Sequence, residues 1–334
     1  MRALIIEPVE SLSLSSSPIT GIDLLTYVSP LSLPLSTTIV GAIGSLLNVK
    51  LKSQDPVEGL EELANILIEK LRCRKPIIAG PLTQFSYRNA WSKPMVNIGW
   101  RLFVNPDCIT NDYTIDVDSC SEAQGLAEFS PIIATGVSLE RTVTEKHVEG
   151  AKKARVGYFY KYPMLSYTII AGKTREVAKP RFIYAFNCDE CIEGYTRVGG
   201  EGRIARVYTQ DIEVEGEIMS PLSISEGTFI ALSPIPILPL RNDLLLLEPQ
   251  DVAGLEFVTE IIGVPRGDRG LPHKILVERL GLGFYEVKKI RRPQIISLPP
   301  GTIIKTGGST KSVQDPLLRI LYTIGFASLY KLRT

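Results

Sequence analysis

Apolar residues recur at helical spacing in three segments of the chain, residues 37–48, 56–73 and 316–331. In the first segment Ile39 and Ile43 fall on one face, as in a helix that packs against a core. The second segment begins with acidic residues and ends with basic ones, which suits the dipole of a helix. The pattern therefore predicts three amphipathic helices.

Extended segments are more numerous than helical ones. Residues 1–10 and 180–188 are rich in aliphatic and aromatic residues, and we expect a strand in each. Residues 137–167 are polar and basic and end in aromatic residues, which predicts a projecting β-hairpin with a turn near Glu149 and Gly150. Because strands and helices do not alternate in regular βαβ units, the predicted fold class is α+β.

Length and composition favour a folded, two-domain protein without membrane-spanning helices. With 334 residues, 44% of them hydrophobic, the chain has the length of two folded domains. No window approaches the roughly 18 uninterrupted apolar residues that a membrane-spanning helix needs. We expect a cytoplasmic protein without a membrane partner.

Charge is distributed unevenly, although the net charge is only +1. Residues 141–181 carry a local balance of +7 and residues 266–292 one of +5, while residues 107–122 and 211–217 are acidic. Such separated patches suit an assembly subunit that meets an anion on one face and a protein on another. The alternative is ordinary solvated charge.

The five cysteines do not form a metal-binding pattern. Cys188 and Cys191 have the spacing of a zinc knuckle, but a tetrahedral zinc needs a second such pair. We expect a turn or a disulfide there, and neither a metal nor a cofactor.

Motifs of common enzyme classes are missing from the sequence. The two histidines leave little choice for a catalytic triad, and the glycine-rich segments have neither P-loop nor dinucleotide-binding spacing. His147 lies among lysines, where it could serve RNA cleavage or act as a simple contact residue. We expect a protein that is not catalytic on its own.

Several glycine-rich or hydroxyl-rich segments lie near basic residues in the sequence. Glycine allows phosphate or sugar to approach the backbone, and helix N-termini attract anions. Tyr158, Tyr160 and Tyr162 could stack bases, or pack in a core. Together these features favour an extended RNA contact over a small-molecule pocket. The candidate RNA-binding residues are Ser36, Thr37, Thr38, Gly41, Arg141, Lys146, His147, Lys152, Lys153, Arg155, Gly199, Gly200, Gly202, Arg203, Lys305, Gly307 and Gly308.

The order of these segments resembles a known family. "PLSLPLSTTIVGAIGSLL" resembles the helix start of the RAMP proteins of CRISPR effectors, and "IIAGPLTQF" resembles the glycine–proline segment that follows in one branch. "TGVSLERTVTEKHVEGAKKARVGYFY" looks like that branch's hairpin insertion, "VGGEGR" its glycine-rich motif, and "RRPQIISLPPGTIIK" its late strand. The branch is the third subunit of type III-B (Cmr) complexes, which caps the crRNA at its five-prime end.

The resemblance implies two ferredoxin-like (RRM-like) domains, residues 1–200 with a thumb insertion around 136–168, and residues 201–334. It implies a crRNA-binding subunit that grips the five-prime handle and presses its thumb into the guide–target duplex near the handle. Its partners would be the crRNA, the target RNA, the large palm-domain subunit and a backbone RAMP subunit.

The resemblance assigns roles to segments and leaves alternatives open. Ser36, Thr37, Thr38 and Gly41 match the helix-start motif, residues 199–203 the glycine-rich motif, and residues 141–155 the thumb. RAMP chains often end in a GxG-type loop, whereas this chain has Ala327 at the second glycine. The helix start could also be a plain N-cap of a buried helix. The rival functions are a repeat-processing endoribonuclease that uses His147, a protein-binding scaffold, and the equivalent subunit of a type III-A complex.

Overall fold

The computed structural model describes residues 1–15, 30–140, 153–200, 202–239, 252–265, 274–308 and 313–333. Within them, short antiparallel strands predominate over a few helices, which is consistent with the predicted α+β class. The helices are α1 (Ser36–Leu46), α2 (Glu58–Leu71), α3 (Val117–Glu122) and α4 (Pro316–Thr323), with a 3-10 turn η1 (Pro106–Cys108). No helix in these ranges is long and apolar enough to span a membrane.

The largest sheet has six strands in the order β12-β13-β1-β11-β2-β3, all antiparallel to their neighbours. Its strands are β12 (Glu193–Arg197), β13 (Ile204–Asp211), β1 (Arg2–Pro8), β11 (Pro180–Cys188), β2 (Cys73–Tyr87) and β3 (Ala90–Trp91). The central strand β1 has apolar residues on both faces because both faces are covered: Leu4 and Ile6 pack with α1 and α2, while Ala3 and Ile5 pack in a second core on the other side.

A five-stranded sheet contributes to both of these cores through Phe103 and Val104. Its strands run in the order β10 (Thr174–Ala178), β9 (Tyr167–Ala171), β6 (Leu126–Phe129), β5 (Leu102–Val104) and β4 (Val96–Ile98). Phe85, Phe103 and Tyr167 meet between the sheets, with ring centroids 5.0–5.7 Å apart. This aromatic cluster fixes the five-stranded sheet against the six-stranded one.

The C-terminal part of the chain builds two further sheets around a third core. The first has the order β14 (Ile218–Met219), β24 (Leu329–Lys331), β15 (Glu226–Ala231), β23 (Ile303–Gly307) and β18 (Val258–Gly263). The second has the order β17 (Val252–Ala253), β16 (Ile235–Pro239), β22 (Gln294–Leu298) and β19 (Glu278–Gly281), and it continues into a hairpin of β20 (Phe284–Tyr285) and β21 (Ile290–Arg291).

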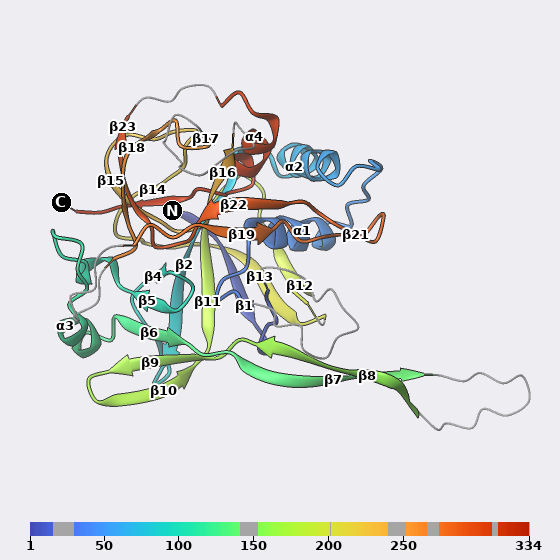
Figure 1. Ribbon diagram of the computed structural model, residues 1–334, viewed down its shortest axis with the longest axis horizontal. Coiled ribbons are helices and arrows are strands. Elements are labelled where there is room, and N and C mark those ends of the chain that lie inside the picture. The colour runs from blue at the N-terminus through green and yellow to red at the C-terminus, as the bar shows by residue number, and fades with distance from the viewer. Residues whose placement is uncertain are drawn as a thin grey trace, which may run out of the picture.

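A two-stranded ribbon of β7 (Ile132–Glu140) and β8 (Lys153–Met164) extends away from the body of the molecule (Figure 1). It covers the described part of the segment for which the sequence predicts a hairpin. The expected turn near Glu149 and Gly150 lies outside the described residues.

The last predicted helix is too long. Helix α4 ends at Thr323 and is followed by a buried turn and by β24 instead of by more helix. Gly325 and Ala327 both have a positive φ, +103° and +54°, which ends the helical path. The turn packs on β2 so closely that a Cβ on Gly325 would lie 2.5 Å from the carbonyl oxygen of Ile78. The end of the chain therefore contributes core and not an exposed loop.

Candidate nucleic-acid interface

The segment that leads into α1 is fixed by two buried tyrosines. The hydroxyl of Tyr167 donates to the carbonyl oxygen of Ser32 at 2.8 Å, and that of Tyr184 donates to Pro34 at 3.1 Å. Burial raises the pKa of both phenols well above the ordinary value, so both remain protonated donors. The hydroxyl-rich helix start is thereby held in one position over the six-stranded sheet.

Only part of this helix start reaches the surface. Ser36 and Thr37 are 2% and 5% exposed, whereas Thr38 is half-buried and Gly41 is exposed. The N-cap residue is Leu35, and its side chain makes no capping hydrogen bond, so a hydroxyl N-cap is the wrong interpretation. The Thr37 hydroxyl is buried without a hydrogen-bond partner among the described residues. An RNA could thus meet Thr38 and Gly41 without rearrangement.

The glycine-rich segment is the turn between β12 and β13. The Val198 amide donates to Arg203 across the turn at 2.8 Å, and the Gly200 amide donates to Ser13 at 2.8 Å. Gly199 has a φ of +78°, and a Cβ there would lie 2.5 Å from the Ser13 carbonyl oxygen. The backbone requires a glycine at 199, while Gly200 and Gly202 are exposed.

Arg203 joins this turn to the root of the β7–β8 ribbon. Its guanidinium donates to the Glu10 carboxylate at 2.5 Å and to the Tyr162 hydroxyl at 2.8 Å. The hydrogen bond from Arg203 lowers the pKa of Glu10, and the same bond raises the pKa of Arg203. Arg203 therefore acts here as a structural clamp, with its charge already paired.

One short segment, residues 10–14, connects the candidate elements. Besides the contact of Glu10 with Arg203, Leu12 accepts from Leu165 after β8 at 2.8 Å, and Leu14 accepts from Leu31 before α1 at 3.1 Å. The helix start, the glycine turn and the ribbon root are thus attached to the same five residues.

The basic residues expected in the ribbon are partly outside the described residues. This applies to Arg141, Lys146, His147 and Lys152. Lys153 and Arg155 lie in β8, and in the backbone register Lys153 is opposite Glu140 of β7. The β7–β8 ribbon that contains them extends away from the sheets (Figure 1).

Lys305, Gly307 and Gly308 lie apart from this group, at the end of β23 (Figure 1). Lys305 forms an ion pair with Glu260 of β18 at 2.7 Å, which raises the pKa of the lysine. A Cβ on Gly308 would lie 3.0 Å from the backbone of Glu226. Strand β23 lies at the upper left of Figure 1, whereas the β7–β8 ribbon lies at the lower right.

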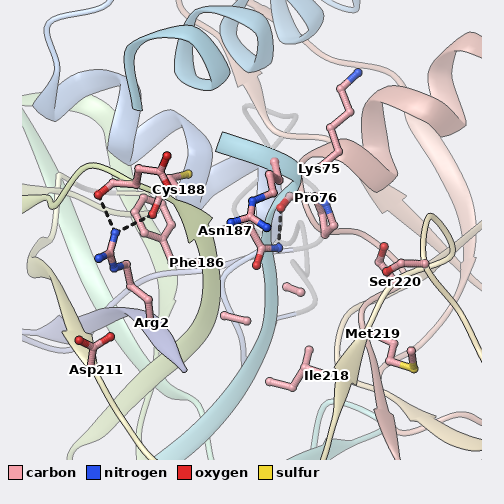
Figure 2. A pocket seen from close by; sticks show the side chains of 15 residues that line it. Arg2, Lys75, Pro76, Phe186, Asn187, Cys188, Asp211, Ile218, Met219 and Ser220 are labelled. Carbon is pink, nitrogen blue, oxygen red and sulfur yellow. Dashed lines mark hydrogen bonds between the residues drawn. The ribbon is translucent and has the colours of Figure 1, made fainter. Parts of the chain in front are cut away.

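A polar cleft of about 610 Å³ was not anticipated from the sequence (Figure 2). Arg2 and Asp211 lie on one side of it, and Lys75 and Ser220 on the other. Arg2 is held in place by the carbonyl oxygens of Cys188 and Asp189, at 3.0 and 2.6 Å. Cations and carboxylates together can bind a ligand that carries both an anionic group and hydrogen-bond donors. The lining residues come from four distant segments, so no sequence motif marks the cleft.

The cysteines form two disulfides, Cys73–Cys188 and Cys108–Cys120, and Cys191 is free and exposed. Cys188 therefore pairs with the cysteine opposite it on β2 and not with its sequence neighbour. No group of metal-ligating side chains occurs in the part of the chain that the structure describes.

Neither a protein-family model nor a curated protein matches the sequence. Solved structures do match. A chain in the cryo-EM structure of the type III-B Cmr-beta bound to cognate target RNA superimposes with a TM-score of 0.61 at 18% identity, over 99% of this chain and 96% of that one. This protein has the fold of that chain. The same complex with target RNA and AMPPnP, in state 1, contains a chain with a TM-score of 0.59 at 18% identity, covering 98% of this chain and 95% of that one.

Proposed function

We propose that the protein is a non-catalytic, crRNA-binding subunit of a type III-B (Cmr) RNA-guided interference complex. The observation that carries the proposal is the match of the whole fold to a chain of a target-RNA-bound Cmr-beta structure, with a TM-score of 0.61. The order of the sequence motifs resembles the same family and supports the proposal independently of the fold.

Within that complex we propose that the protein is the capping subunit, which binds the five-prime handle of the crRNA. Two ferredoxin-like domains form its framework. The order β13-β1-β11-β2, with α1 and α2 between β1 and β2, supports the first of them. The β7–β8 ribbon is its thumb and inserts into the guide–target duplex near the handle.

In this proposal RNA binds on the side of the molecule that carries α1, the glycine turn and the ribbon. Gly41 in α1, and Gly200 and Gly202 in the turn, are exposed and allow phosphate and sugar to approach closely, next to the half-buried Thr38. The cations of residues 141–155 supply the electrostatic part of the affinity. The large palm-domain subunit and the first backbone subunit bind next to the handle.

The test is purification of the tagged protein from its native host, with sequencing of the RNA and identification of the proteins that accompany it. Short RNAs that share one five-prime handle, together with a large palm-domain subunit, are the expected result. A protein recovered without RNA would overturn the proposal. Co-purification with proteins of a type III-A complex would instead assign the subunit to that type of complex.

A catalytic role is tested with the same preparation. The proposal expects no cleavage of repeat RNA by the purified chain. Metal-independent cleavage that disappears in His147→Ala would show that the protein is a processing endoribonuclease and would overturn the proposal of a capping subunit.

A further inference from the structure

The β20–β21 hairpin presents exposed apolar side chains among charged ones, of which Lys288, Lys289 and Arg291 are basic and Glu286 is acidic. Within its eight residues, Phe284, Val287 and Ile290 are 44%, 43% and 44% exposed. Lys288 and Lys289 in its turn are exposed and form no ion pair with a described residue. We name residues 284–291 the basic hairpin.

The basic hairpin is held rigidly by its inner face. Tyr285 is 1% exposed, its hydroxyl donates to Ser53 at 2.7 Å, and a Cβ on Gly59 would overlap its ring. Arg292 lies over the Tyr285 ring at 5.2 Å and donates to the carbonyl oxygens of Phe284 and Pro56 at 2.8 and 3.3 Å. The exposed apolar side chains are therefore presented in a fixed arrangement, which lowers the entropy cost of docking.

We infer that the basic hairpin is a docking site for another protein chain, one whose surface has an apolar hollow bordered by Asp and Glu residues. The inference rests on the proposed function, because the partner is a neighbouring protein of the same assembly. Apolar side chains at the centre with charged residues around them are the usual anatomy of a protein interface. The cations require acidic residues opposite them for complementary charge.

A protein fits the basic hairpin better than RNA does. Single-stranded RNA binds to proteins by stacking its bases on aromatic rings, with cations along its backbone. Two of the three exposed apolar side chains, Val287 and Ile290, are aliphatic and offer no ring for stacking. An apolar protein surface would remove all three from water.

The site borders the candidate RNA surface. Gly283, directly before β20, lies next to the start of α1, and a Cβ on it would be 4.0 Å from the Thr37 hydroxyl. A protein on the basic hairpin would therefore be a neighbour of RNA bound at Thr38 and Gly41.

The test compares lysine acetylation in the free chain, in the assembly purified from the host, and in that assembly after ribonuclease treatment. Lys288 and Lys289 are expected to react at least tenfold more slowly in the assembly, and this protection is expected to survive the ribonuclease. Carbodiimide treatment is expected to link them to Asp or Glu residues of one other subunit.

A double variant provides the second arm. Lys288→Glu with Lys289→Glu is expected to lower the amount of the crosslinked subunit in the assembly at least tenfold, while the recovered RNA stays within twofold. Lys173→Glu with Lys179→Glu makes the same change of charge at two exposed lysines beside β10, and it is expected to retain that subunit.

Three results would overturn the inference: unchanged acetylation in the assembly, protection that disappears with ribonuclease, or carbodiimide links to a second copy of this chain. Each can occur while handle-bearing RNA is still recovered. Failure of the docking site is thus distinguishable from failure of the proposed function.

Discussion

At the scale of single residues, Arg203 has the clearest role among the candidate RNA-binding residues. Its charge is neutralised by Glu10 and its second branch is occupied by Tyr162. A cation that is paired in this way contributes more to holding the ribbon than to attracting phosphate.

Replacing Arg203 by alanine is expected to loosen the β7–β8 ribbon at its root. Loss of a hydrogen bond to a charged group should lower the free energy of unfolding by about 1–3 kcal/mol. Amide exchange in β8 should accelerate, which mass spectrometry can measure. Arg206→Ala is the control, because Arg206 pairs with Glu193 across β12 and β13 without touching the ribbon. Equal exchange in the two variants would contradict the clamp.

Glu278 gives the protein a defined dependence on pH. Burial raises its pKa to about 7, although the Trp100 indole donates to both of its oxygens at 2.7 and 2.9 Å. The folded protein then holds this proton more tightly than the unfolded chain, so the free energy of unfolding falls as pH rises from about 4.5 to about 7. The fall should reach at most about 3 kcal/mol.

Glu278→Gln is expected to remove this fall, because an amide carries no charge at either pH. Urea unfolding near pH 5 and near pH 8 measures it as the difference between the variant and the original protein. The same fall in both proteins would show that other groups cause it.

At the scale of elements, the two glycines of α1 have different surroundings. Gly41 faces open space, whereas a Cβ on Gly44 would lie 2.8 Å from the Leu63 side chain of α2. Gly44 therefore lets the two helices approach, and Gly41 has no such packing role.

Gly41→Ala is expected to stabilise the fold by about 1 kcal/mol, through helix propensity. Gly44→Val is expected to destabilise it by about 1–3 kcal/mol, through crowding against α2. Thermal or urea unfolding measures both changes. If RNA contacts Gly41 closely, Gly41→Ala will also weaken RNA binding, although the variant protein is more stable. Unchanged RNA binding would show that Gly41 is not part of the interface.

Several strands and turns can be predicted from the local sequence, whereas the long-range contacts between them cannot. The strand at Pro180–Cys188 has its predicted bounds, because its apolar run is continuous and ends in polar residues. The turn at residues 199–203 can be predicted from its glycine-rich sequence. The contacts of Arg203 with Glu10 and Tyr162 cannot, because these residues lie 193 and 41 positions away in the sequence. The helix over 316–331 was predicted too long because helical spacing alone does not reveal the turn at Gly325.

The strand order of the six-stranded sheet is a second feature that the local sequence pattern does not predict. Strand β13 follows the expected domain boundary at residue 200, yet it pairs with β1 along its whole length. Pairing between segments so far apart depends on tertiary contacts that no local motif contains.

At the scale of the whole molecule, the Cys73–Cys188 disulfide joins two neighbouring strands across 115 residues of chain. Cys108–Cys120 closes a separation of only 12 residues. The longer loop loses more freedom in the unfolded chain, so the two bonds should differ in their contribution to stability.

Serine at both Cys73 and Cys188 is expected to lower the free energy of unfolding by about 2–4 kcal/mol. Serine at both Cys108 and Cys120 should cost about 2 kcal/mol less. Urea unfolding of both variants, with the reduced original protein as reference, measures the difference. Equal losses would show that chain freedom does not decide the effect.

RNA binding by the assembled molecule should depend on salt through the ribbon. Lys152→Ala with Lys153→Ala removes two cations, so the slope of log affinity against log salt should become shallower by about 1.4 for single-stranded RNA. Filter binding over a range of potassium chloride concentrations measures this slope. Lys173→Ala with Lys179→Ala is the matched control, and an unchanged slope in the ribbon variant would remove both lysines from the interface.

The central place of β1 has a consequence for how the chain is made. Both neighbours of β1, the strands β11 and β13, begin at residues 180 and 204, far behind it in synthesis. At about 5–20 residues per second, a ribosome needs roughly 10–40 s to produce the first of these partners after β1. During that interval an apolar strand waits with both edges unpaired, which is the condition in which nascent chains aggregate or recruit chaperones. The strand on which the largest sheet is centred therefore stays without either partner while residues 9–179 are synthesised.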